Sequence, residues 1–189
     1  MPFPSEPERQ NMLRLARQAV VDAVSRGQLS DKIAKDGPLA EPRGVFVTLR
    51  LMRRLRGCIG VIEGDEPLGE SIVRCAASAA LQDPRFAPLR LEDLAELQVE
   101  ISLLSLPAAI DPAQVEVGRH GLLVSRGTQR GLLLPQVAVE HGLTREQFLD
   151  EACRKALLPR EAWRDPETQV LGFTCDVFAD DGVTSGRAT

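Results

Sequence analysis

The sequence predicts an α+β fold with a mainly antiparallel sheet flanked by helices. Some segments alternate apolar and polar residues, as strands do, whereas others repeat apolar residues every three or four positions, as helices do. These segments intermix without the regular strand and helix alternation of a parallel α/β protein. Two pairs of strand segments are also separated only by short turns, which is typical of hairpins. Together these observations favour the α+β class.

The first half of the chain begins with a helix whose two ends have clear signals. Ser5 and Glu8 have the spacing of a capping box, and apolar residues then recur at helical spacing. Gly27 is the residue type that most often ends a helix. The sequence then predicts a polar loop, the two strands of a hairpin and a second helix, over residues 30–43, 44–51, 55–63 and 68–81.

The second half is expected to contain shorter elements. Pro135 opens a short helix that ends at His141, and a capping box at Thr144 starts another helix that Pro159 stops. Trp163 is expected to anchor the local packing. The small, polar residues after position 180 predict a disordered tail over 181–189. The strands are expected over residues 97–106, the second half of 117–124, 132–134 and 169–178.

Composition and charge exclude several classes of function. The chain has 189 residues, enough for one domain with a substantial core. A net charge of −4 argues against non-specific nucleic-acid binding, although four arginines between positions 50 and 56 make a local basic patch. No apolar run approaches the roughly 18 residues of a membrane span, and the first residues lack the pattern of a signal peptide. We therefore expect a cytoplasmic protein that does not enter membranes.

Motifs for common cofactors are not found in the sequence. It contains neither a phosphate-binding P-loop, nor a dinucleotide-binding glycine turn, nor a serine nucleophile elbow. The four cysteines form no C-x-x-C pair, and the two histidines are too scattered for a zinc signature. We therefore predict no metal site, and the sequence does not indicate any cofactor.

The stretch Leu55–Gly60 places Cys58 close to two glycines, with Arg56 two residues earlier. The pKa of a free thiol is about 8.5, and a nearby cation or imidazolium lowers this pKa and enriches the reactive thiolate. Cys58 is therefore a candidate nucleophile. Arg56 shares the strand face of Cys58 if no bulge intervenes. The alternative is that Cys58 is a small packing residue and that the glycines serve a bulge or a close approach of the backbone.

His120 is the candidate partner of the thiol. It lies between two glycines, and histidine is the usual general base near neutral pH. The alternative is a structural hydrogen bond at a turn. His141 is different, because it occupies the last turn of a predicted helix, where a cation is favourable whatever the function.

Other polar residues could complete a site. Arg56, Arg85 and Arg119 are candidates for binding a phosphate or a carboxylate, because guanidinium groups bind these anions bidentately. Arg85 could instead pair with the nearby Asp83 or contact a carbonyl, and the other two could be exposed hairpin charges. Glu100 should lie on the strand face opposite the core, where it either orients His120 or pairs with an arginine, or is a solvated residue. Gln136 is either a polar contact in the same cleft or simply a helix-start residue.

Several motifs in order resemble one family, the AMMECR domain family, and most closely its bacterial AmmeMemoRadiSam system protein A branch. The resemblance covers about residues 10–180, and the stretch around Cys58 is the hallmark of the family. One departure is Leu157, which replaces a helix-ending glycine. The motifs lie at residues 44–49, 55–60, 79–80, 83–86, 100–102, 118–121 and 133–137.

The resemblance implies one domain of two lobes over residues 1–180, in a cytoplasmic protein. It also implies a setting shared with a Memo-like protein and a radical S-adenosylmethionine enzyme, but it does not supply an activity. Two hypotheses follow. The chain is a cysteine-dependent enzyme, or an enzyme partner, that uses Cys58 and His120; alternatively, it is a binding module with an arginine-bordered cleft.

Overall fold

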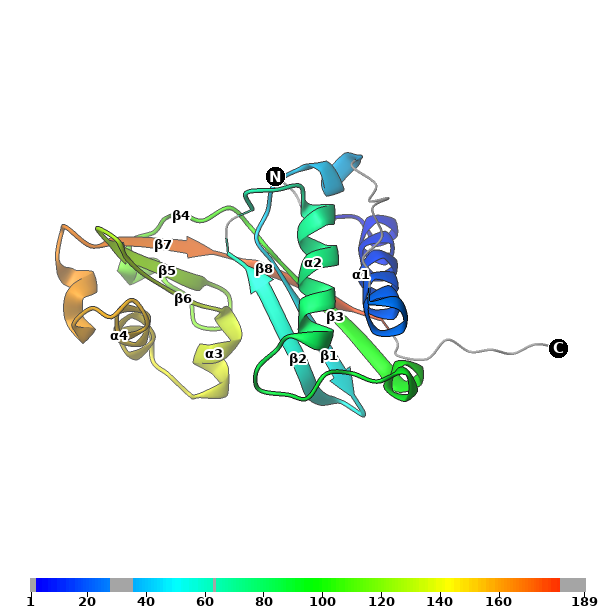
Figure 1. Cartoon of the computed structure of the whole chain (residues 1–189). Coiled ribbons are helices and arrows are strands. Elements are labelled where there is room, and N and C mark those ends of the chain that lie inside the picture. Colours follow the sequence, from blue (N-terminus) through cyan, green and yellow to red (C-terminus); the bar gives the residue numbers. More distant parts are fainter. Residues whose placement is uncertain (1–2, 28–35, 63, 181–189) are drawn as a thin grey trace. The chain divides into compact units, whose positions relative to one another are not determined.

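The computed structural model describes residues 3–27, 36–62 and 64–180. The chain divides into two compact units, each with its own sheet and its own apolar core (Figure 1). The larger unit contains the residues up to Leu103 and again those from Asp176 onward, and the smaller unit contains Leu104–Cys175. Each sheet has four strands and carries helices, which confirms the predicted α+β class.

The sheet of the larger unit has the strand order β2-β1-β3-β8, and β1 pairs antiparallel with both β2 and β3. The predicted hairpin is confirmed, with Met52 and Arg53 at its tip in the left-handed backbone region. Val47 and Leu49 of β1 are fully buried, as strand alternation requires for one face. The four strands are β1 (Val45–Leu51), β2 (Arg54–Val61), β3 (Leu97–Leu104) and β8 (Cys175–Ala179).

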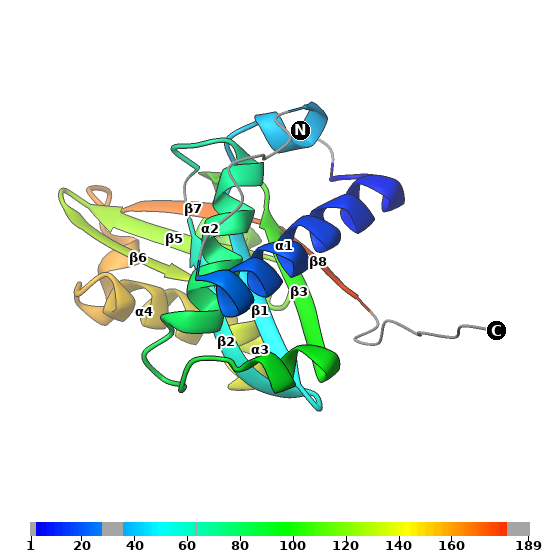
Figure 2. The same ribbon diagram turned by 45° about the vertical axis from the view of Figure 1, so that its right-hand side comes forward.

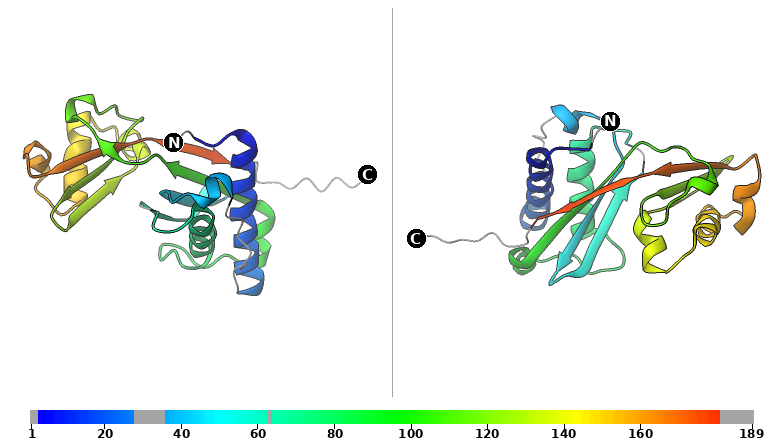
Figure 3. Two further views of the ribbon diagram at one scale, coloured as in Figure 1. Left: turned by 90° about the horizontal axis from the view of Figure 1, so that it is seen from above. Right: turned by 180° about the vertical axis from the view of Figure 1, so that it is seen from behind.

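Helices α1 (Glu6–Arg26) and α2 (Leu68–Leu81) pack on one face of this sheet and against each other (Figure 2). The capping box of α1 is present, since the backbone N–H of Ser5 donates to the Glu8 carboxylate at 2.7 Å. Gly27 ends α1 in the left-handed conformation. Alanines on α2 allow its backbone to approach the sheet closely. Seen from behind, the strands of this unit lie in front of its two helices (Figure 3, right).

The smaller unit has a sheet in the order β4-β7-β5-β6, with every pairing antiparallel. Helix α4 packs on β5 and β6 around the buried Phe148 and Leu149, and Thr144 caps its first turn as predicted. Trp163 packs against this core and donates to Asp150 at 2.8 Å. The elements are β4 (Ala108–Ala109), β5 (Gly121–Arg126), β6 (Gln129–Leu133), α3 (Pro135–Glu140), α4 (Arg145–Lys155) and β7 (Gln169–Phe173).

One expectation about the chain path needs correction. The strand predicted over 169–178 is two strands, because the chain leaves the sheet of the smaller unit at Thr174 and enters that of the larger unit. Ser105 fixes the break, since its backbone N–H donates to the Thr174 carbonyl and its hydroxyl accepts from the Thr174 N–H. Alternation continues through this break, so periodicity alone does not reveal it. Short 3₁₀ helices also occur at Gly37–Ala40, Leu91–Glu96, Pro112–Gln114 and Arg160–Arg164.

Asp180, the last described residue, is tied to the larger unit. The carboxylate of Asp180 accepts hydrogen bonds from Arg17 at 2.6 Å and from the backbone N–H of Val99 at 3.0 Å. The disorder predicted for 181–189 concerns residues outside the described ranges, as does much of the predicted loop over 30–43. Within residues 3–27, 36–62 and 64–180, no helix combines the length and the apolar character that crossing a bilayer requires.

Candidate functional site

A polar row crosses the sheet of the larger unit at Cys58. Thr48 is the register partner of Cys58 on β2 and of Glu100 on β3, so the three side chains share one face. This face is opposite to the one that packs on the helices, because Leu49 and Val99 point into the core. The prediction that Glu100 lies opposite Val99 is therefore confirmed. Glu100 is half-buried and lies 3.5 Å from the guanidinium of Arg50.

Cys58 is held at three points. Its sulfur accepts a hydrogen bond from the Thr48 hydroxyl at 3.3 Å. Its backbone N–H donates to Asp83 Oδ2 at 2.8 Å, and its carbonyl accepts from Arg85 Nη2 at 3.2 Å. The side chain is half-buried, so the sulfur is not sealed within an apolar core. Cys58 is therefore a positioned residue on a rigid strand, next to the loop that follows α2.

Asp83 and Arg85 form the clamp on the backbone of Cys58. Arg85 donates to Asp83 through Nε at 3.0 Å and through Nη2 at 2.7 Å, which confirms the ion pair considered for this arginine. The Asp83 side chain is only 2% exposed, whereas that of Arg85 is 54% exposed. The hydrogen bond from Arg85 is the main reason that the pKa of Asp83 lies well below its usual range, and the N–H of Cys58 adds to it against the opposing effect of burial.

The same contacts raise the pKa of Arg85 above its ordinary value. The Asp83 carboxylate is the main cause, and Cys58 makes a smaller contribution of the same sign. The guanidinium therefore remains a cation and lies beside both the Asp83 carboxylate and Cys58. Its ring-stacking contact with Phe86, at 5.4 Å from the ring centroid, further limits its freedom.

Gly57 and Arg56 mark a bulge in β2. The register shifts between Leu49 and Arg50 of β1, which leaves Arg56 as the extra residue of β2. Its guanidinium donates to the carbonyl of Ala87 at 2.8 Å. Because this bulge intervenes, Arg56 does not share the strand face of Cys58. Gly57 is required for a different reason, because a Cβ there would lie 2.1 Å from the carbonyl oxygen of Ala79 on α2.

The other cysteines of the two cores are packing residues. Cys75 lies on the buried face of α2, as predicted, and burial raises the pKa of its thiol to about 11. Cys153 is fully buried in the smaller unit, where desolvation also raises its pKa. Within the described residues, no group of three or more His, Cys, Asp or Glu side chains is arranged to hold a metal ion.

The smaller unit carries a second group of predicted residues around a polar hollow of about 570 Å³. Arg119, His120 and Arg145 line it, together with Glu116. Arg119 donates to the Glu116 carboxylate at 2.9 Å, and Arg145 donates to the carbonyl of Ala113 at 2.8 Å. The hollow therefore presents two guanidinium groups, an imidazole and one carboxylate.

The hydrogen bond at His120 bears on its chemistry. His120 Nδ1 accepts from the backbone N–H of Glu116 at 3.0 Å, so its lone pair is already used. The neutral ring must then carry its proton on Nε2, which makes the free nitrogen a donor. This arrangement favours a role in binding an anion over a role as a general base. It also matches the structural hydrogen bond considered as the alternative for this histidine.

The predicted residues thus form two groups, one in each unit. Cys58, Arg85 and Glu100 belong to the larger unit, whereas Arg119 and His120 belong to the smaller one. Their assembly into a single site stays a prediction. Gln136 lies in the first turn of α3, and its buried Oε1 accepts no hydrogen bond from a described residue.

Sequence reasoning did not single out Thr48, and it did not single out Arg145. Thr48 was assigned only to a strand, and knowledge of its register with Cys58 would have been needed to find it. Arg145 lies within the capping box of α4, where a charged residue is ordinary, so its residue type does not indicate a site. In both cases the neighbour is distant in the sequence, so local spacing carries no signal.

Comparison with known proteins finds similarity over most of the chain. A family model described as AMMECR1 matches residues 13–178. A protein of Thermococcus gammatolerans is 43% identical over 182 residues, covering 90% of this chain and 89% of its own length. One from Methanothermobacter thermautotrophicus is 41% identical over 187 residues, covering 94% and 97%. The crystal structure of an uncharacterized protein from Pyrococcus horikoshii has a TM-score of 0.80 at 40% identity, covering 91% of each chain.

Proposed function

Because the chain belongs to the AMMECR1 family, we propose that it acts through the thiol of Cys58, as a cysteine-dependent enzyme or as an enzyme partner in a modification pathway. The partners in this proposal are a Memo-like protein and a radical S-adenosylmethionine enzyme, and the setting is the cytoplasm. The resemblance of the sequence motifs supports the partners, and the contacts of Cys58 support the chemistry.

The observation that carries the proposal is the triple restraint on Cys58. Thr48, Asp83 and Arg85 each bond a different atom of this residue, which is half-buried rather than sealed. A cysteine used only for packing needs no such contacts, as the fully buried Cys75 illustrates. Preorganisation of a thiol on a rigid strand, beside a cation, is what nucleophilic catalysis requires.

The proposed step is attack on an electrophilic acyl carbon. The thiol of Cys58 gives up its proton to solvent, and the sulfur donates an electron pair to form a carbon–sulfur bond. The leaving group departs with the electron pair of the bond that breaks. Arg85 supplies positive charge beside the sulfur, and Thr48 supplies a hydrogen bond to it. The part of His120 stays a prediction, because that residue belongs to the smaller unit.

Site-resolved alkylation tests this proposal. The rate of Cys58 modification by iodoacetamide, followed by peptide mass spectrometry, is expected to exceed that of glutathione at the same pH by about threefold or more. Arg85→Gln should lower the rate, whereas the matched variant Arg56→Gln should not, because Arg56 is bonded to Ala87 instead. A rate no faster than that of glutathione, or an equal effect of the two variants, would contradict a thiol-based mechanism.

A second candidate function is anion binding without covalent chemistry. The specific observation that favours it is the polar hollow with Arg119, His120 and Arg145. Inorganic phosphate is a suitable probe, because its binding can be followed by calorimetry at low and high salt. Under this alternative, Arg119→Gln weakens phosphate binding and Cys58→Ser leaves it and the cellular function unchanged. Loss of cellular function in Cys58→Ser, with stability retained, would argue against it.

A further inference from the structure

A groove of about 870 Å³ lies beside α4 in the smaller unit. Its walls come from β6, α3, α4, the connection between the two helices and the segment that follows α4. Its volume falls in the range of about 300 to 1,000 Å³ that is common for small-molecule sites. The groove lies within one unit and contains neither Cys58 nor His120, so the inference below does not depend on the proposed function.

Four of the eight side chains that line the groove are aliphatic. They come from four different segments, and they are Leu133, Val137, Leu143 and Leu157. Leu133 and Leu143 also pack against the core of the smaller unit, so this wall is anchored. An apolar wall of this kind favours an apolar ligand group, because burial removes that group from water.

Leu157 is the unusual member of this wall. It occupies the position after α4 at which a helix commonly ends in glycine, with φ +61°. The backbone bonds of this motif are complete, since Leu157 N–H donates to Arg154 and Leu158 N–H donates to Cys153. The end of α4 therefore keeps the backbone hydrogen bonds of a glycine-terminated helix, although Leu157 occupies the position of the glycine. A residue with a Cβ is strained in this conformation.

The strain at Leu157 is not offset by burial, because this residue is 83% exposed. A leucine that is strained, exposed and located at the rim of an apolar groove contributes little to the fold. The same side chain would be buried by a ligand in the groove. This combination is the first argument for an apolar ligand group next to Leu157.

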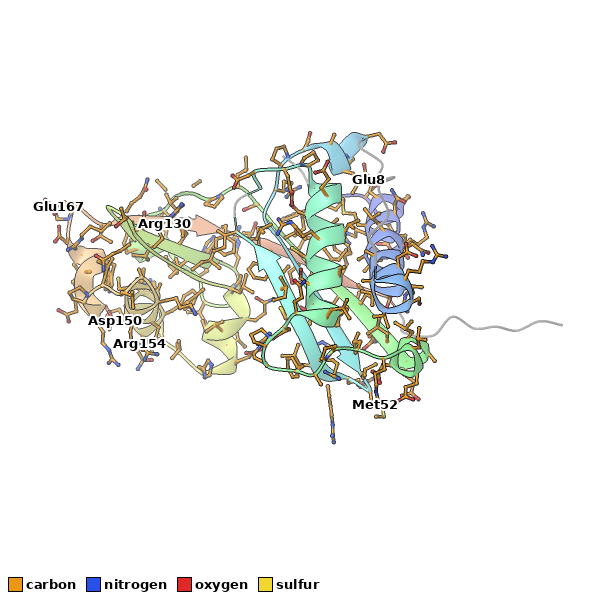
Figure 4. The ribbon with its side chains drawn as sticks, viewed as in Figure 1. Glu8, Met52, Arg130, Asp150, Arg154 and Glu167 are labelled. Atoms are coloured by element: carbon orange, nitrogen blue, oxygen red, sulfur yellow. The ribbon has the colours of Figure 1, made fainter. Side chains whose placement is uncertain are left out.

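The charged side chains at the rim of the groove indicate the head group of the ligand. Glu151 accepts from Arg154 at 2.8 Å and lies 3.8 Å from Arg160, so its charge is already balanced (Figure 4 labels Arg154). Lys155 also lines the groove, and within the described ranges its side chain makes no ion pair or hydrogen bond with another residue. His141 adds a further nitrogen donor. The rim therefore has an excess of positive charge, which favours an anion.

We propose that this groove binds a small amphipathic carboxylate, with its carboxylate at Lys155 and its hydrocarbon body on the aliphatic wall that includes Leu157. Lys155 also lies in the last turn of α4, where any cation stabilises the helix. The test must therefore separate ligand binding from stability at both residues.

Octanoate and octanol provide the matched probes, since they share the chain length and differ in the charge of the head. Calorimetric titration of the full chain is expected to show octanoate binding at least about tenfold tighter than octanol. In Lys155→Gln this preference disappears while octanol binding is unchanged. A helix-dipole role alone would lower the melting temperature and leave the preference intact.

Leu157→Gly gives the sharpest result, because the two measurements should move in opposite directions. Glycine removes the backbone strain, so the melting temperature rises, whereas loss of the side chain weakens octanoate binding several-fold. Leu106→Ala removes another exposed leucine of the same unit, outside the groove, and should leave octanoate binding unchanged. Absence of octanoate binding to the unmodified chain, or equal binding by Leu157→Gly, would overturn the proposal.

Discussion

The two faces of the sheet in the larger unit give their cysteines opposite environments. On one face Cys58 lies in a row with Thr48 and Glu100, half-buried and bonded to polar groups. On the other face the helices pack, and Cys75 of α2 is fully buried among aliphatic residues. Burial raises the pKa of the Cys75 thiol to about 11. The same residue type therefore has two different roles within one unit.

This difference teaches that the surroundings of a thiol, rather than its presence, decide its chemistry. A desolvated thiol stays protonated and inert, because a charged thiolate is unfavourable in an apolar environment. The Cys58 thiol instead accepts a hydrogen bond and is only half-buried, so reagents can reach it.

The largest expected effect is on alkylation of the two cysteines. Cys58 should react with iodoacetamide in the native protein at least about 1,000-fold faster than Cys75, because Cys75 reacts only after local opening of the core. Peptide mass spectrometry over a time course measures both rates in one sample. After unfolding in guanidinium chloride the two rates should become similar. Comparable native rates would show that the helix-covered face is not closed to solvent.

The second effect concerns the close approach of β2 to α2. Gly57→Ala should lower the free energy of unfolding by about 3 kcal/mol, because its Cβ would lie 2.1 Å from a backbone atom that cannot rotate away. Gly127→Ala is the matched control, since a Cβ there meets no atom within 4 Å and only the positive φ opposes it. Urea unfolding measures both. Equal costs would mean that backbone conformation, and not the contact with α2, explains Gly57.

The third effect concerns the carboxylate that holds the backbone of Cys58. Asp83→Asn should lower the free energy of unfolding by about 2 kcal/mol at neutral pH. The substitution removes the negative charge and one acceptor oxygen from the buried partner of Arg85, whereas Arg85 itself is largely exposed. Glu92→Gln, in the exposed pair with Arg90, should cost less than about 0.5 kcal/mol.

The cost of Asp83→Asn should also depend on pH. The pKa of Asp83 is lower in the folded chain than the value of about 3.9 in the unfolded chain. Its carboxylate therefore contributes its full stabilisation above about pH 4, and this contribution is lost progressively as the pH falls from there through the much lower pKa of the folded chain. Urea unfolding at pH 7, 5 and 3 should show the same difference between the two proteins at pH 7 and 5 and a smaller difference at pH 3. A difference that stays constant would contradict the assigned role.

The smallest effect is expected for Thr48. Thr48→Val removes the hydroxyl that donates to the Cys58 sulfur but keeps a β-branched residue in the strand, so the fold should lose only about 0.5–1 kcal/mol. Because this hydrogen bond orients the Cys58 sulfur, alkylation of Cys58 should slow by about threefold without it. An unchanged rate would show that this hydroxyl contributes to the sheet and not to the thiol.

Much of the fold was predictable because its signals are local. The capping boxes at Ser5 and Thr144, the glycine at the end of α1 and the buried stripe of α2 all depend on residues within a few positions of one another. The break at Thr174 was not predictable, because its cause is a pair of hydrogen bonds with Ser105, far away in the chain. Local alternation is the same whether a segment joins one sheet or two.

The candidate site was only half predictable for the same reason. Cys58, Arg85 and Glu100 were found from their residue types and neighbours, and the Asp83–Arg85 pair follows from a separation of two residues. The bulge at Arg56 and the contact of Thr48 with Cys58 required the pairing of β1 with β2. Side-chain periodicity cannot report an extra residue in a strand until its partner strand is known.

The amino-acid order by itself determined the class of fold, the helix ends and which residues face each core, because these follow from periodicity and capping over short distances. Only the tertiary structure decided that Cys58 is held by Asp83, Arg85 and Thr48 while Cys75 is sealed, and that Leu157 is strained at the rim of a groove. The physical reason is that hydrogen bonding, burial and strain depend on groups brought together from distant parts of the chain.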